Sequence, residues 1–138
     1  MDHAATIRRG YELISAGQVD QFADLLVDDF TEHEETPGMP PGKEGVRQLF
    51  KMMRAAFPDL HLEPEDVLVD GDKVVARVRC TGTNEGEFMG MPPTGKSVDL
   101  EFIDIIRFGD DGLAREHWGV FDRMGMMEQL GLVPAAPA

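Results

Sequence analysis

The segment from Glu116 to Asp122 combines side chains that could do acid–base chemistry with the only tryptophan of the chain. If it is a strand, successive side chains point to opposite faces, so Glu116, Trp118 and Asp122 share one face and His117 lies on the other, unless a bulge shifts the register. A carboxylate beside a tryptophan and nearby methionines would be poorly solvated, which makes it a better proton carrier near neutral pH. The pattern therefore predicts Asp122 as an acid–base residue, and the alternative, an N-cap of a following helix, stays open.

Asp104 is the one polar residue in an alternating row that is otherwise apolar. A buried carboxylate must be paired, hydrogen-bonded or protonated. We expect Asp104 either to bind a substrate hydroxyl or hold a histidine, or to be a satisfied buried aspartate without a functional role.

His33 stands among three glutamates, Glu32, Glu34 and Glu35. The cluster invites a metal interpretation, but it lacks His-x-His or HExxH spacing and a second histidine at helical distance. A pocket histidine, or a solvated acidic stretch with a surface histidine, fits the pattern better, and we expect no metal.

Other patterns do not point to further chemistry. The run from Gly82 to Gly86 is not a phosphate-binding loop, so nucleotide binding is not expected. Cys80, the single cysteine, lies in an alternating apolar run, which favours a small buried hydrophobic residue over a nucleophile.

Helical periodicity dominates the first part of the chain. A helix begins after Asp2 as N-cap and ends at Gly17, and a short second helix carries Val19 and Phe22. Prolines make residues 36–42 a loop. The clearest helix follows and stops at Pro58, and its apolar face consists of Val46, Leu49, Phe50, Met53 and Phe57.

From Leu60 the apolar period changes to two. Strands are expected near 60–69, 74–80, 97–108 and 113–121, with hairpin signals at 70–72 and 109–112. A last helix starts at Asp122 and ends at Gly131. Helices followed by an antiparallel meander define an α+β class, and residues 30–33 could add a short strand.

Composition bounds the class of protein. The chain has 138 residues with 42% hydrophobic residues, which favours one domain, expected at 1–133 with a flexible tail at 134–138. A net charge of −13 disfavours nucleic acid and anionic membranes as partners. The N-terminus lacks the layout of a secretion signal, so a cytoplasmic location is expected.

Several strings together give the chain a resemblance to a known family. It resembles the SnoaL-like polyketide cyclase (ester cyclase) family of the NTF2-like, or cystatin-like, superfamily. The strings that carry the resemblance are 88–96, 105–108, 111–112, 116–118, Asp122 and 127–131. The resemblance implies a cone-shaped α+β barrel, in which a curved, mainly antiparallel sheet encloses a deep apolar pocket, and homodimers or homotetramers formed through the outer face of the sheet.

The resemblance also implies a reaction without cofactor or metal, the intramolecular aldol cyclisation of a polyketide ester or related chemistry on an apolar carbonyl compound. Asp122 matches the family's acid–base aspartate, and His33 would reach into the pocket as a second catalytic residue. Residues expected to contact the substrate are Trp118, Asp104, Glu116, Phe50, Met53 and Phe88. An isomerase, a dehydratase or a hydroxylation partner would show the same residues, and a non-catalytic binding or interaction module remains the alternative.

Overall fold

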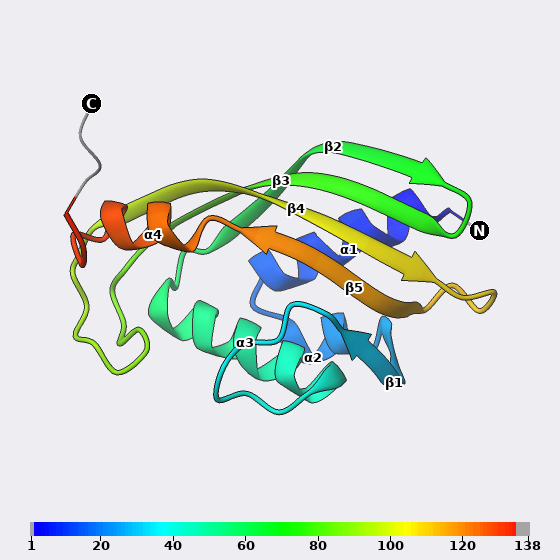
Figure 1. Ribbon diagram of the computed structural model, residues 1–138, viewed down its shortest axis with the longest axis horizontal. Helices are drawn as coiled ribbons and strands as arrows, with labels where there is room; N and C mark the ends of the chain where they lie inside the picture. The colour runs from blue at the N-terminus through cyan, green and yellow to red at the C-terminus, as the bar shows by residue number, and fades with distance from the viewer. Residues whose placement is uncertain (1, 135–138) are drawn as a thin grey trace.

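The computed structural model describes residues 2–134 (Figure 1). Residues 135–138 of the expected tail lie outside the described residues. Within the described residues, four helices and five strands follow one another: α1 (His3–Ser15), α2 (Val19–Ala23), β1 (Leu26–Glu32), α3 (Gly42–Ala56), β2 (His61–Asp70), β3 (Lys73–Thr83), β4 (Ser97–Phe108), β5 (Ala114–Phe121) and α4 (Arg123–Gln129).

Helix α1 begins and ends close to the residues that the sequence predicted. The Asp2 side chain accepts a hydrogen bond from the Ala5 amide at 3.0 Å, which satisfies one of the free donors of the first turn. Gly17 follows the helix with φ of +79°, a backbone conformation that glycine adopts without steric cost. The buried face of α1 includes Ile7, Tyr11 and Ile14, as its spacing predicted.

Helix α3 is held close to the loop that precedes it, residues 33–41. A Cβ on Gly45 would lie 1.9 Å from the carbonyl oxygen of Pro40, so only glycine permits this approach of loop and helix. The helix ends at Ala56, two residues before Pro58. The loop that carries the glutamate cluster is therefore packed against the first turns of α3.

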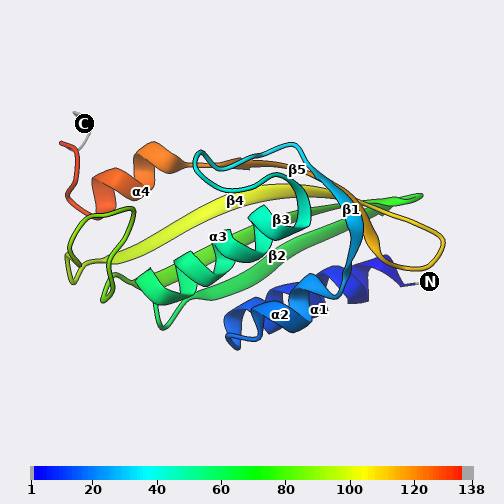
Figure 2. The same ribbon diagram turned by 90° about the horizontal axis from the view of Figure 1, so that it is seen from below.

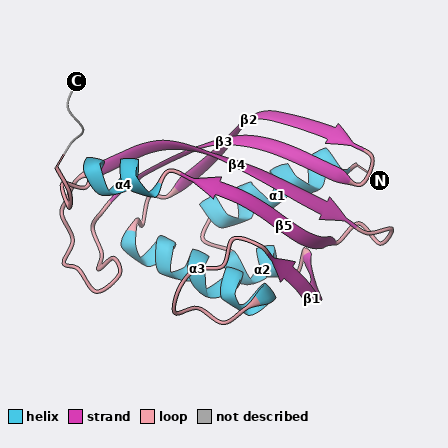
Figure 3. Cartoon of the chain, viewed as in Figure 1, coloured by secondary structure: helices cyan, strands magenta, loops and turns pink. Residues whose placement is uncertain are grey.

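The antiparallel meander expected from residue 60 onward is confirmed in β2 to β5, and a parallel edge strand, β1, makes the sheet mixed. Its strand order is β1-β5-β4-β3-β2, and β1 pairs with β5 in parallel while the other pairs are antiparallel (Figure 3). Periodicity along one strand predicts which side chains share a face, but it carries no information about the strand's partner. The parallel addition of β1 at the edge brings Glu32 beside His117.

One face of the sheet carries the core. Helices α1, α2 and α3 lie against this inner face (Figures 1 and 2), and the inward residues of β3, Val74, Ala76, Val78 and Cys80, are buried. Burial raises the pKa of the Cys80 thiol to about 11, so the thiol stays neutral and packs as a small hydrophobic residue, as expected. Each helix among residues 2–134 is too short or too polar to cross a membrane.

Candidate functional site

The pairing of β4 with β5 decides which side chains face the interior. Asp104 lies opposite Gly119, and Ile106 lies opposite His117. Residues paired directly across antiparallel strands point to the same face. Because the Asp104 row packs on the core, His117 also points inward.

A chain of hydrogen bonds connects four elements in this interior, α1, β4, β5 and β1. The Tyr11 hydroxyl of α1 donates to Asp104 Oδ2 at 2.7 Å. His117 Nε2 lies 2.7 Å from Asp104 Oδ1, and His117 Nδ1 lies 2.5 Å from Glu32 Oε1 at the end of β1. Asp104 is only 8% exposed. It holds a histidine, which is one of the roles expected for it.

The two carboxylates keep His117 charged. Burial alone lowers the pKa of His117, but the hydrogen bonds and charges of Asp104 and Glu32 outweigh it and raise the pKa to about 10. Both ring nitrogens then donate to carboxylates. His117 is therefore a fixed interior cation and not a free base, since neither nitrogen is left to accept a proton.

Tyr11 remains a neutral donor. Its burial, together with the negative charge of Asp104, raises the pKa of its phenol well above the ordinary value. A neutral hydroxyl can donate to Asp104, and that bond satisfies the second carboxylate oxygen. The side chains of Asp104 and His117 are thus locked by partners from α1 and β1.

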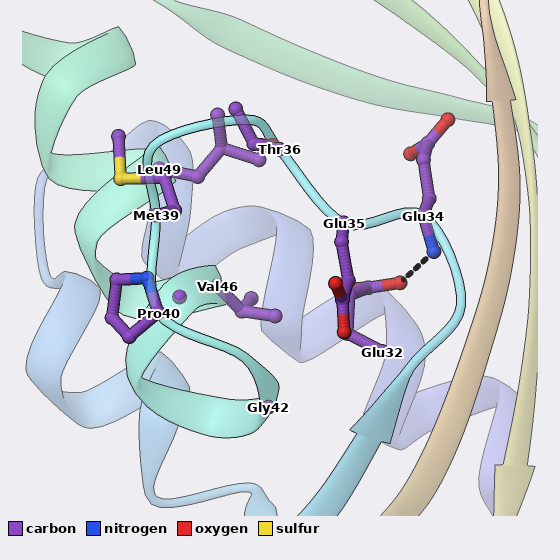
Figure 4. Close-up of a pocket in the computed structure, with 10 residues that line it drawn as sticks. Glu32, Glu34, Glu35, Thr36, Met39, Pro40, Gly42, Val46 and Leu49 are labelled. Atoms are coloured by element: carbon purple, nitrogen blue, oxygen red, sulfur yellow. Dashed lines mark hydrogen bonds between the residues drawn. The ribbon is translucent and has the colours of Figure 1, made fainter.

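Glu34 lies next to this cation, close to the backbone of Gly119. A Cβ on Gly119 would lie 2.8 Å from His117 Nε2 and 3.0 Å from Glu34 Oε1, so the two groups can approach this closely only because residue 119 has no side chain. Partial burial raises the pKa of Glu34, and the charge of His117 offsets this only in part. Figure 4 shows the Glu34 side chain directed toward the sheet, while its backbone amide donates to Glu32 Oε1 at 2.9 Å.

A small hollow lies on the other side of the glutamates. Glu32 and Glu34 border it, together with the loop and helix residues Met39, Val46 and Leu49 (Figure 4). It has room for about one water molecule, whereas a drug-sized ligand needs several hundred Å³. A ligand can enter here only if the loop 33–41 moves away from α3, so this hollow is not the deep pocket that the resemblance implied.

Three apolar side chains of the interior are only partly buried. Phe102 and Phe121 lie opposite each other on the inner face and remain only partly buried, with their ring centroids 6.1 Å apart. Met53 of α3 is likewise only partly buried. These three side chains pack against the core and leave part of their apolar surface exposed.

Glu116 and Trp118 share a face, as predicted, but it is the outer one. Trp118 lies opposite Ile105 and Glu116 lies opposite Arg107, both in the outward row of β4. Arg107 Nε donates to Glu116 Oε1 at 2.7 Å. The expectation that these residues line the interior is corrected by the register of β5 against β4, which puts the odd-numbered His117 inside.

The expected position of His33 inside the pocket is corrected as well. Its Nε2 lies 2.8 Å from Glu116 Oε2, and its ring stacks on Trp118 with a centroid distance of 4.8 Å. Its side chain is 40% exposed, so it lies on the outer face and does not reach into the interior. The cause is that β1 ends at Glu32, and Glu32 is the residue that turns inward.

Asp122 is the N-cap of α4. Its Oδ1 accepts from the Gly125 amide at 2.8 Å, and the residue is exposed at the end of β5. The structure therefore shows the helix-capping role that was the alternative to an acid–base role for Asp122. The neighbouring Arg123 is close enough to Glu34 for its charge to oppose the rise in the pKa of Glu34, so the start of α4 and the glutamate lie at the same end of the interior.

The three other residues expected to contact the substrate differ in how deeply they are buried. Phe88 is buried and packs edge-to-face on Phe57, with centroids 5.6 Å apart. Phe50 packs in the same way on Phe22 of α2, at 5.4 Å. Met53 is partly buried against the core.

The sequence interpretation missed Tyr11, Glu32, Glu34 and His117 as interior polar groups. Tyr11 carried a signal, since the chain's only tyrosine lies on the buried side of a helix and a buried hydroxyl needs a partner. Nothing in the local pattern distinguishes Glu34 from Glu35. Among residues 2–134, no group of three or more histidine, cysteine or acidic side chains is arranged to hold a metal ion.

Comparisons with known proteins agree with this architecture. The family model described as SnoaL-like polyketide cyclase matches residues 4–130. The aklanonic acid methyl ester cyclase DauD of Streptomyces sp. (strain C5) is 30% identical over 129 residues, which cover 91% of this chain and 79% of that protein.

Solved structures extend the agreement to the fold. IdmH of Streptomyces antibioticus, a candidate polyketide cyclase, matches with a TM-score of 0.81 and 32% identity over 95% of this chain and 99% of that one. AclR of Streptomyces galilaeus, a candidate hydroxylase, matches with a TM-score of 0.87 and 26% identity over 99% of this chain and 85% of that one. The expected NTF2-like, or cystatin-like, α+β fold is confirmed. The chain belongs to the SnoaL-like polyketide cyclase family.

Proposed function

We propose that this protein is an enzyme that cyclises a polyketide ester, or a related apolar carbonyl compound, by an intramolecular aldol reaction. The family and the name of the relative DauD support this class of substrate. The partly buried Phe102, Phe121 and Met53 supply apolar surface on which such a molecule can lie.

One observation carries the proposal: a charged histidine is held in the interior by two carboxylates. Burying the three charges of His117, Asp104 and Glu32 costs free energy that an apolar core would not. Such perturbed groups in an interior are typical of functional sites. In an aldol step, negative charge develops on a carbonyl oxygen, and a fixed cation near that oxygen lowers the barrier.

Asp122 is the proposed base. Its Oδ1 is used by the helix cap, but Oδ2 has no hydrogen-bond partner among the described residues, so the carboxylate still has an oxygen that can accept a proton. It would remove a proton from the carbon next to a carbonyl and so generate the nucleophile. Holding both ends of one flexible substrate in a reactive pose supplies about 7 kcal/mol or more of the remaining barrier reduction.

The second candidate is a non-catalytic module that binds a small molecule or a protein. The small hollow and the capping role of Asp122 favour it. It predicts a bound ligand that is released unchanged.

Self-association through the outer face is part of the proposal. Leu68, Ile103 and Val120 are 65%, 48% and 77% exposed on that face, and exposed apolar side chains gathered in this way are typical of an interface. The net charge of −13 argues against nucleic acid or an anionic membrane as the partner. A cytoplasmic location stays a prediction.

The test is to incubate the protein with aklanonic acid methyl ester and follow the products by chromatography with mass detection. An aldol ring closure neither adds nor removes atoms, so the product has the mass of the substrate and a new retention time. Asp122→Asn should lower turnover by about 10²–10⁴-fold, because the amide cannot take the proton. Asp24→Asn, an exposed aspartate outside the site, is the control.

The outcomes separate the two candidates. Ligand binding without a product supports the binding module, and full activity of Asp122→Asn removes Asp122 from the mechanism. If the protein neither binds nor converts this ester, that result contradicts the proposed substrate class.

A further inference from the structure

Glu34 has a free carboxylate beside Glu32, whose own carboxylate accepts hydrogen bonds. Glu32 Oε1 accepts from both His117 and the Glu34 amide. The carboxylate of Glu34 has no hydrogen-bond partner among the described residues, although the residue is half-buried. A carboxyl group held in this way keeps its hydrogen-bonding capacity for a molecule that enters the interior.

The position of that carboxylate relative to His117 is set by Gly119. Oε1 of Glu34 and Nε2 of His117 both lie within 3.0 Å of the position that a Cβ on Gly119 would take, so only glycine lets the two groups come this close. Gly119 lies opposite Asp104 on the inner face, so the Glu34 carboxylate lies beside the locked pair of Asp104 and His117. An oxygen atom of a substrate that contacts the Glu34 carboxyl group would therefore also lie near the His117 cation.

The charges around Glu34 come from every element packed near it. Burial favours its neutral form and raises its pKa, and the negative charges of Asp104 on β4 and Glu32 on β1 act in the same direction. The cations His117 on β5 and Arg123 on α4 act against them, and the net pKa remains raised. By contrast, Asp122 is exposed, and its Oδ1 accepts a hydrogen bond from the Gly125 amide.

We propose that Glu34 is a catalytic acid of this site, which donates its proton to the alkoxide oxygen formed next to His117. This inference rests on the proposed aldol reaction and assigns a second proton-transfer residue to it. Burial and the nearby carboxylates favour the neutral form of Glu34, and a neutral carboxyl group next to the reacting oxygen can serve as the acid.

Asp122 takes a proton from the carbon next to a carbonyl, and the electron pair left on that carbon forms the new carbon–carbon bond to a second carbonyl carbon. The oxygen of the second carbonyl becomes an alkoxide, the O–H bond of Glu34 breaks, and its proton goes to that oxygen. Glu34 is left ionised and Asp122 protonated, and exchange with water restores both.

The experiment compares Glu34→Gln with the wild type across a pH series, with aklanonic acid methyl ester as the probe. Gln keeps the shape of the side chain but cannot supply this proton, so kcat should fall by about 10²–10⁴-fold with little change in KM. In the wild type, kcat should fall as pH rises through the raised pKa of Glu34, and this limb should be absent from the variant. Glu34→Asp, which retains the acid, should recover part of the rate.

Glu85→Gln is the matched control, since Glu85 is exposed and lies in another loop. Wild-type kcat with an unchanged pH profile in Glu34→Gln would overturn the proposal while leaving the cyclase activity intact. If the wild type makes no product, the proposed function fails for this ester, and a carboxyl titration by ¹³C NMR still decides on Glu34. A Glu34 carboxyl that titrates no higher than the exposed glutamates would overturn the inference, and one that titrates above them would support it.

Discussion

His117 Nε2 and Asp104 Oδ1 lie 2.7 Å apart on neighbouring strands, although the two residues are not direct cross-strand partners. Asp104 lies opposite Gly119, and the histidine reaches it diagonally across the space that glycine leaves. This contact joins the core side of β4 to β5, and through Tyr11 and Glu32 it also joins α1 and β1. Stability, site geometry and charge therefore depend on the same pair.

The charged state of His117 should make folding stability depend on pH. Its pKa is about 10 in the folded protein against an ordinary value of 6.5, so its contribution is complete below pH 6.5 and is lost as pH rises toward 10. The loss should amount to roughly 3–5 kcal/mol, since one pKa unit corresponds to about 1.4 kcal/mol. Urea unfolding of the wild type and His117→Gln at pH 6 and pH 10 measures it.

The difference between those two proteins isolates His117, because Cys80 and the other groups that titrate in this range are common to both. The wild type should be clearly the more stable protein at pH 6, and the gap should narrow at pH 10. A gap that does not change with pH would show that His117 is not held as a cation.

Gly119→Ala should disturb the site more than the fold. The new methyl group would lie 2.7 Å from His117 Cε1 and 3.0 Å from Glu34 Oε1, so one of the two side chains must move. We expect the free energy of unfolding to fall by about 1–3 kcal/mol. Turnover should fall by more than the decrease in the fraction of folded protein explains. Urea unfolding and steady-state kinetics on the same preparation test both.

Gly10→Ala is a suitable comparison for that variant. A Cβ there meets Phe22 at an ordinary contact distance of 3.5 Å, and alanine is favoured over glycine inside a helix such as α1. Gly10→Ala should therefore leave stability unchanged or raise it by up to about 1 kcal/mol. Equal behaviour of the two alanine variants would contradict the steric argument for Gly119.

Val120→Lys should weaken self-association. Val120 is the most exposed of the large apolar residues on the outer face, and it pairs with Ile103 across β5 and β4. A stable dimer buries on the order of 1,000 Å² or more, and a lysine at the centre of such an area would be desolvated without a partner. Light scattering coupled to size-exclusion chromatography should show a dimer or tetramer for the wild type and a shift toward monomer for the variant.

Met124→Lys is its control, because Met124 is 62% exposed but lies on α4 and not on the sheet. A wild type that remains monomeric at high protein concentration would rule out the outer face as an interface.

The sequence by itself determined the elements whose signals are local. The Asp2 cap and the Ile7, Tyr11 and Ile14 spacing define α1, alternation defines β4 over the bounds that the structure shows, and Asp122 caps α4. These features depend on hydrogen bonds and side-chain directions within a few residues, which the order of residue types specifies directly. Alternation also separated Glu116 and Trp118 from His117.

Only the tertiary structure decided which of those two sets faces the interior. A strand has two faces, and its partner's register chooses between them, so β4 turned His117 inward and Trp118 outward. The bond between Tyr11 and Asp104 spans 93 positions of the chain, and the parallel pairing of β1 with β5 brought Glu32 to His117. Contacts of this kind arise from the burial of whole elements against one another, and a pattern within one segment cannot contain them.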